Sequence, residues 1–88
     1  MITVDKKDEN TFQVAVEKRG SKTTHTVTLT DKYYKKLTGG ILSKEDLIKK
    51  SFEFLLEREP KESIMSKFDL TVISKFFPEY ESYISMEH

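Results

Sequence analysis

The amino-acid sequence predicts an α+β fold that forms one domain over residues 1–88, with a β meander over residues 1–30 and a helical part over residues 31–88. Three observations support this prediction. Apolar and polar residues alternate over residues 12–30, which is the period of a half-buried strand. After Leu29 the apolar residues recur at helical spacing instead. A chain of 88 residues also has the length of one compact domain rather than two.

Two alternating runs predict an antiparallel hairpin. The first covers residues 11–18, and the second covers residues 22–30 and is rich in β-branched threonine and valine. Gly20 between them can adopt the positive φ of a tight turn, whose central pair is either Arg19-Gly20 or Gly20-Ser21. Both registers place the same residues on one face of the hairpin, namely Phe12, Val14, Val16, His25, Val27 and Leu29.

A third strand containing Ile2 and Val4 would extend the hairpin into a three-stranded meander. An isolated hairpin is only marginally stable in water, so a third strand or a covering helix is required. The sequence therefore predicts either a hairpin or a three-stranded meander that packs against a helix.

Two helices are predicted after the meander. Asp31 can cap a short helix that Gly39-Gly40 ends with residues that tolerate the left-handed conformation. Ser43 can accept hydrogen bonds from the first turn of the main helix, which runs over about residues 44–58 and stops before Pro60. The apolar face of this long helix is expected to cover the sheet.

The last third of the chain predicts short helices. Asp69 is a good N-cap for a helix over residues 70–76, and Pro78 disfavours the helical conformation at Phe77. Pro78 then suits the start of a final turn or helix over residues 79–84, and residues 85–88 are expected to fray. Four residues of the segment from Leu70 to Phe77 are expected to face inward: Leu70, Ile73, Phe76 and Phe77.

The sequence lacks the groups that catalysis and metal binding need. It has no Cys, which excludes disulfides, thiolate metal sites and a catalytic thiol. His25 lies mid-strand on the apolar face, and His88, which is either native or an expression remnant, is the last residue. Gly39-Gly40 lacks the other glycines and the lysine of a phosphate-binding loop. We therefore predict no catalytic, cofactor-binding or metal-binding residue, and a protein that is not an enzyme.

The charge pattern bears on partners. The chain has 15 basic and 15 acidic residues, a balance that argues against non-specific nucleic-acid binding. The basic residues predominate in residues 1–44 and the acidic ones in residues 45–88. Either the two faces of one small domain neutralise each other, or the asymmetry orients a partner or guides self-association into a homodimer. No apolar run approaches the roughly 18 residues of a membrane span, and the first residues lack the apolar run of a signal peptide. We therefore expect a cytoplasmic protein without membrane contact.

The C-terminal aromatic residues have two interpretations. They either complete the core of a small domain or form an exposed patch that contacts a protein partner. With no catalytic group available, the sequence favours a non-catalytic, cytoplasmic protein–protein interaction module. The candidate contact residues are Phe76, Phe77, Tyr80 and Tyr83.

Several segments together resemble a family of small uncharacterised prokaryotic proteins of about 90 residues. This resemblance covers nearly the whole chain and implies no activity. The segments that carry it are His25-Thr26-Val27-Thr28-Leu29, Leu37-Thr38-Gly39-Gly40, Ser51 to Pro60, Phe68-Asp69-Leu70 and Phe76 to Glu81.

A second, local resemblance gives an alternative function. Within residues 25–58, the run from Thr26 to Asp31, followed by the run from Ser43 to Ile48, is similar to the strand and second helix of ribbon–helix–helix repressors and antitoxins. In that family two strands of a dimer enter the major groove, and the second helix holds a phosphate at its N-terminus. The resemblance implies a DNA-binding transcriptional regulator or antitoxin-like protein. Its candidate DNA contacts are Thr26, Thr28, Thr30, Ser43 and Lys44.

Overall fold

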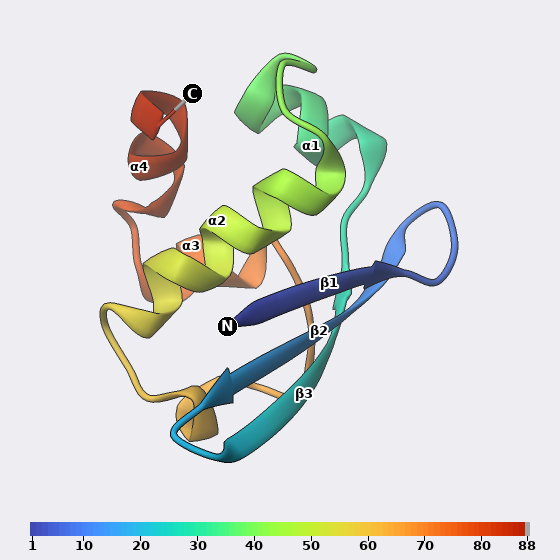
Figure 1. Ribbon diagram of the computed structural model, residues 1–88. Helices are drawn as coiled ribbons and strands as arrows, with labels where there is room; N and C mark the ends of the chain where they lie inside the picture. Colours follow the sequence, from blue (N-terminus) through green and yellow to red (C-terminus); the bar gives the residue numbers. More distant parts are fainter. Residues whose placement is uncertain (88) are drawn as a thin grey trace.

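The computed structural model describes residues 1–87, in which four helices pack on one face of a four-stranded mixed sheet (Figure 1). The strands lie in the order β1-β2-β3-β4. β1, β2 and β3 form an antiparallel meander, and β4 runs parallel to β3. The strand bounds are β1 Ile2–Lys6, β2 Thr11–Lys18, β3 Ser21–Thr28 and β4 Lys67–Asp69. The α+β class is confirmed, and the predicted meander forms three of the four strands.

Each of the four segments in which a helix was predicted contains an α-helix, although the bounds differ from the prediction. The α-helices are α1 Asp31–Thr38, α2 Lys44–Leu56, α3 Val72–Phe76 and α4 Tyr80–Glu87, and a 3₁₀ turn η1 covers Lys61–Ser63. α2 lies across the sheet, as expected, and α1 and α4 stand side by side beyond it (Figure 1). No helix within residues 1–87 has the length and apolar character needed to cross a membrane.

The predicted hairpin is confirmed in its face assignment. Phe12 pairs with Val27 and Val14 with His25, and all four side chains are buried beneath α2. The two-residue loop is Arg19-Gly20, because Lys18 pairs directly with Ser21. Both loop residues have positive φ, 53° at Arg19 and 81° at Gly20, which is the backbone of a type I′ turn. That turn twists in the same sense as the two strands and fixes their register.

Replacing Arg19 by Gly is expected to raise the free energy of unfolding by about 0.5 kcal/mol, because a non-glycine residue with positive φ is strained. Urea unfolding followed by circular dichroism measures the change. The matched control is Ser21→Gly, whose backbone is extended and which should lower stability. A stability gain in the control, or none at Arg19, would contradict the turn geometry.

The structure corrects the prediction for residues 67–77. Lys67–Asp69 forms the strand β4. The Thr26 amide donates to the Ser66 carbonyl oxygen at 2.7 Å, and the Leu70 amide donates to the Thr28 carbonyl oxygen at 2.9 Å. These two hydrogen bonds hold the segment against β3 as a strand. The helix then starts only at Val72, so Asp69 does not cap it directly.

Capping residues define most of the other helix ends. Thr30, rather than Asp31, caps α1, and its Oγ1 accepts from the Tyr33 amide at 3.2 Å. Ser43 caps α2 as predicted and accepts from the Asp46 amide at 3.0 Å. α2 ends two residues before the predicted end at 58. α4 runs from Tyr80 to Glu87, beyond the predicted end at 84, and His88 lies outside the described residues.

The core lies between the sheet and the helices. It consists of the inward side chains of the meander, the apolar face of α2, two residues each from α1 and α4, and single residues from β4 and α3. Its largest fully buried members are Tyr80, Phe12, Phe52, Phe54, Leu29 and Leu47. Phe76 was predicted to face inward and is instead 68% exposed. α3 spans only Val72–Phe76, and Ile73 is its buried residue.

Candidate functional site

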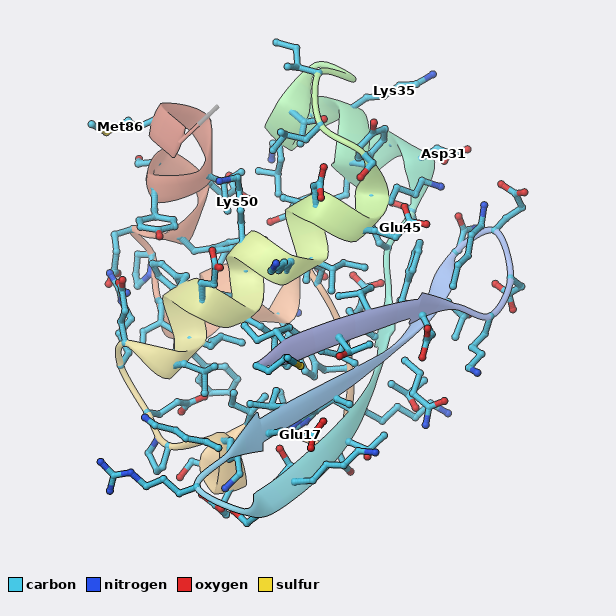
Figure 2. The ribbon with its side chains drawn as sticks, viewed as in Figure 1. Glu17, Asp31, Lys35, Glu45, Lys50 and Met86 are labelled. Carbon is cyan, nitrogen blue, oxygen red and sulfur yellow. The ribbon has the colours of Figure 1, made fainter. Side chains whose placement is uncertain are left out.

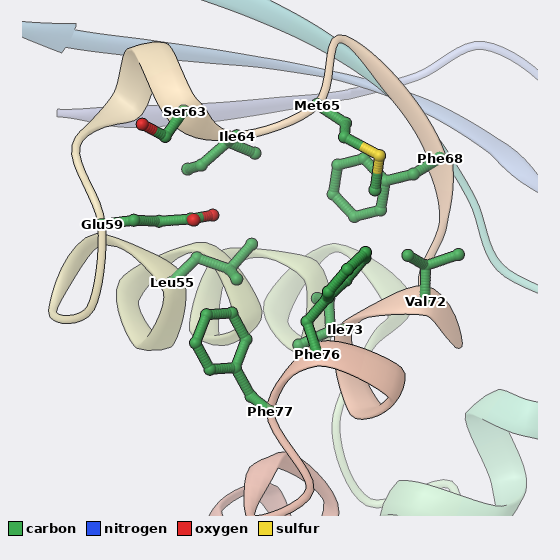
Figure 3. A pocket seen from close by; sticks show the side chains of 10 residues that line it. All are labelled: Leu55, Glu59, Ser63, Ile64, Met65, Phe68, Val72, Ile73, Phe76 and Phe77. Atoms are coloured by element: carbon green, nitrogen blue, oxygen red, sulfur yellow. The ribbon is translucent and has the colours of Figure 1, made fainter.

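An apolar groove of about 320 Å³ lies between the C-terminal end of α2, the segment from η1 to β4, and α3 (Figure 3). Its side chains converge from these separate segments on a common space (Figure 3). The buried residues Ile64, Phe68 and Ile73 form the floor. The groove is therefore continuous with the hydrophobic core.

Two exposed apolar side chains stand at the rim of this groove. Phe76 is 68% exposed and Met65 is 44% exposed. The other exposed large apolar side chains, Met1, Ile41 and Met86, are not part of its lining; Met86, for example, points away from α4 (Figure 2). Single exposed apolar residues are ordinary on protein surfaces, whereas several around one concave surface are typical of a binding site.

Long-range hydrogen bonds hold the segment that forms one wall of the groove. The carbonyl oxygen of Met65 can only accept, so His25 donates to it from Nδ1, at 2.7 Å. The second ring nitrogen, Nε2, lies 2.9 Å from Thr23 Oγ1 and accepts from that hydroxyl in the neutral ring. His25 is 2% exposed and its ring lies 5.3 Å from that of Phe52. This histidine is therefore a buried structural residue that fixes Met65 to β3.

The four predicted partner-contact residues divide into two pairs. Phe76 and Phe77 line the groove, as exposed and half-buried side chains respectively. Tyr80 is fully buried, and its hydroxyl lies 2.6 Å from Ser51 Oγ. Burial raises the pKa of the Tyr80 hydroxyl above its ordinary value. Tyr83 is half-buried, with its ring against Phe54 of α2. The four aromatics thus do not form one surface.

The side chains that the second resemblance assigned to DNA contact have structural partners. Thr30 and Ser43 each cap a helix. Lys44 forms an ion pair with Asp31 and donates to the Glu9 carbonyl oxygen at 3.0 Å, which leaves its side chain 13% exposed. These contacts direct all three side chains toward their own chain.

β3 carries the remaining two of these residues, Thr26 and Thr28. Thr28 Oγ1 donates to Asp69 Oδ1 at 2.6 Å, and Thr26 is half-buried on the face of the sheet opposite α2. Between Thr26 and Thr28 the strand pairs with β2 on one side and β4 on the other. A ribbon–helix–helix dimer needs a free edge on this strand for its twin, and this stretch offers none.

No protein-family model, curated protein or solved structure matches this chain. Both resemblances stated above therefore stay predictions. Within residues 1–87 there is also no cluster of three or more His, Cys, Asp or Glu side chains that could hold a metal ion.

The sequence identified only Phe76 and Phe77 among the residues that line the groove. The other eight were not predicted as site residues: Leu55, Glu59, Ser63, Ile64, Met65, Phe68, Val72 and Ile73. The apolar residues from Ile64 to Phe68 were the available signal, but nothing local to them indicates what they pack against. Their position depends on β4 pairing with β3, a contact between segments about 40 residues apart in the sequence.

Proposed function

We propose that this chain is a non-catalytic interaction module that binds a segment of another protein in the groove beside α3. The observation that supports the proposal most is the exposure of Phe76 at the rim of an apolar groove. Aromatic side chains beside apolar pockets are typical anchors of protein interfaces. Phe77 and Met65 extend the same surface, and the flexible thioether of Met65 can adapt to the shape of an occupant.

The size and openness of the groove suit one or two side chains of a partner segment. Its volume of about 320 Å³ is near the lower limit for a site that encloses a small molecule. A partner segment instead covers the rim as well as the floor and buries Phe76, which is the largest apolar gain that this surface offers. A protein segment is therefore the occupant that we propose.

Replacing Phe76 by Ala is expected to weaken partner binding about ten-fold while leaving the fold intact, because the side chain is an exposed anchor. The partner probe comes from a random peptide library selected on the wild-type chain. Dissociation constants of the selected peptides are then compared between the wild type and the variant by fluorescence anisotropy.

The matched control for this experiment is Ile41→Ala. Ile41 is 75% exposed but lies between α1 and α2, away from the groove lining. Equal weakening in both variants, or selected peptides that ignore Phe76→Ala, would overturn the proposal. Sedimentation of the wild-type chain adds a second check. A dimer that Phe76→Ala converts to monomer would identify the occupant as a second copy of this chain and contradict a separate partner.

A further inference from the structure

A single carboxylate reaches into the apolar groove. Glu59 follows the C-terminal end of α2, and its side chain points between Leu55 and Ile64 toward the centre of the groove (Figure 3). The residue is half-buried, while Leu55 and Ile64 on either side of it are buried. A charged group beside apolar side chains interacts more strongly with an opposite charge than one surrounded by water.

The neighbouring acidic residues already have cationic partners. Glu57 lies 3.3 Å from Arg58 Nη1, and Glu62 forms an ion pair with Lys61. Arg58 also contacts Glu79 at 3.2 Å, so its charge is shared between two carboxylates. Among the ion pairs of residues 1–87, none involves Glu59. Among these acidic residues, the carboxylate in the groove is therefore the one without an ion-pair partner in the described part of the chain.

The end of α2 adds to the negative potential beside Glu59. The C-terminus of a helix carries a partial negative charge, and the last turn of α2 contains no basic residue. Arg58, just beyond the helix, donates from Nη1 to the Phe54 carbonyl oxygen at 3.0 Å and offsets part of this charge. The backbone amide of Glu59 donates to the Leu55 carbonyl oxygen at 2.9 Å, which fixes Glu59 close to the helix end. The Glu59 carboxylate is therefore the main charge that favours a cation at this end of the groove.

We infer that the segment bound in this groove carries a lysine or arginine close to its apolar anchor, and that this cation pairs with Glu59. The inference rests on the proposed function and specifies its partner. The long apolar stem of a lysine or arginine would lie on Leu55 and Ile64 while its charged end reaches the carboxylate. The anchor side chain would meanwhile contact Phe76 and Phe77 at the other end of the groove.

Parallel selections from one random peptide library test the inference. The wild-type chain is expected to enrich peptides with a large apolar residue and a nearby Lys or Arg. Glu59→Gln should keep the apolar preference but lose the basic one, and Glu59→Lys should enrich acidic residues instead. Individual wild-type peptides should bind Glu59→Gln about five-fold more weakly.

The matched control is Glu57→Gln, which removes the same charge from the same turn at a residue outside the groove lining. It should leave the basic preference unchanged. Apolar enrichment without a basic preference in the wild type would overturn the inference and leave the proposed function standing, as would equal effects of Glu57→Gln and Glu59→Gln. Failure of the wild-type chain to enrich any peptide sensitive to Phe76→Ala would overturn the proposed function itself.

Discussion

Replacing Phe54 by Ala is expected to lower the free energy of unfolding by about 4 kcal/mol, one of the largest effects of any single change in this chain. Phe54 is fully buried on α2. Its ring centroid lies 5.3 Å from that of Tyr80 and 5.0 Å from that of Tyr83, both on α4, and the guanidinium of Arg58 lies 3.6 Å from it. The alanine variant would leave a cavity between α2 and α4. Urea unfolding followed by circular dichroism measures the loss.

Two controls separate this cavity from a general effect of removing an aromatic side chain. Phe54→Leu keeps most of the volume and should cost less than half as much. Phe76→Ala makes the same chemical change at a side chain that is 68% exposed, and should alter stability by less than about 0.5 kcal/mol. If Phe54→Ala lowered the free energy of unfolding no more than Phe76→Ala, the result would contradict the packing of α4 against Phe54 of α2.

The hairpin was predictable because its information is local. Alternation over two eight-residue strands identifies the buried face, and a two-residue turn can shift without changing that face. Ser43 before two acidic residues was similarly sufficient to place the start of α2. In each case the deciding contacts lie within a few residues of the pattern that predicts them.

The fourth strand was not predictable in this way. Three residues, Lys67–Asp69, are too few to show an alternating pattern, and their partner strand ends 39 positions earlier, at Thr28. Asp69 does accept from the amide two residues on, at Thr71, as a local turn would require. That signal is shared by turns and helix caps, so it predicted a helix start where the chain forms a strand end.

The candidate site was predicted in part for a related reason. The sequence placed Phe76 and Tyr80 in one aromatic group, but their environments depend on distant residues. Tyr80 is buried because Ser51 on α2 provides a polar partner for its hydroxyl. Phe76, at the last position of the five-residue helix α3, is instead exposed. Nothing near these two residues in the sequence shows that Tyr80 meets a polar partner 29 positions earlier while Phe76 stays exposed.

Asp69 also makes contacts with residues far away in the sequence. Replacing Asp69 by Ala is therefore expected to lower the free energy of unfolding by about 2 kcal/mol. One carboxylate oxygen accepts from Thr28 Oγ1 at 2.6 Å, which links β4 to β3. The other accepts from the Thr71 amide at 3.2 Å and from Thr71 Oγ1 at 2.6 Å, at the start of α3. Since β4 and α3 both contribute to the groove, the variant should also weaken the binding of selected peptides.

The same contacts predict a dependence on pH. Burial pushes the pKa of Asp69 upward, but the hydrogen bonds from Thr28 and Thr71 outweigh it and hold the pKa below its ordinary value. The stabilisation is therefore complete above the ordinary aspartate pKa of about 3.9 and is lost as the pH falls through the lowered pKa. Urea unfolding of the wild type and Asp69→Ala should differ by less at about pH 2 than at about pH 7. Asp5→Ala, on the exposed surface of β1, is the control and should change stability little at either pH. A gap between wild type and Asp69→Ala that stayed constant with pH would mean that the carboxylate charge does not hold β4 to β3.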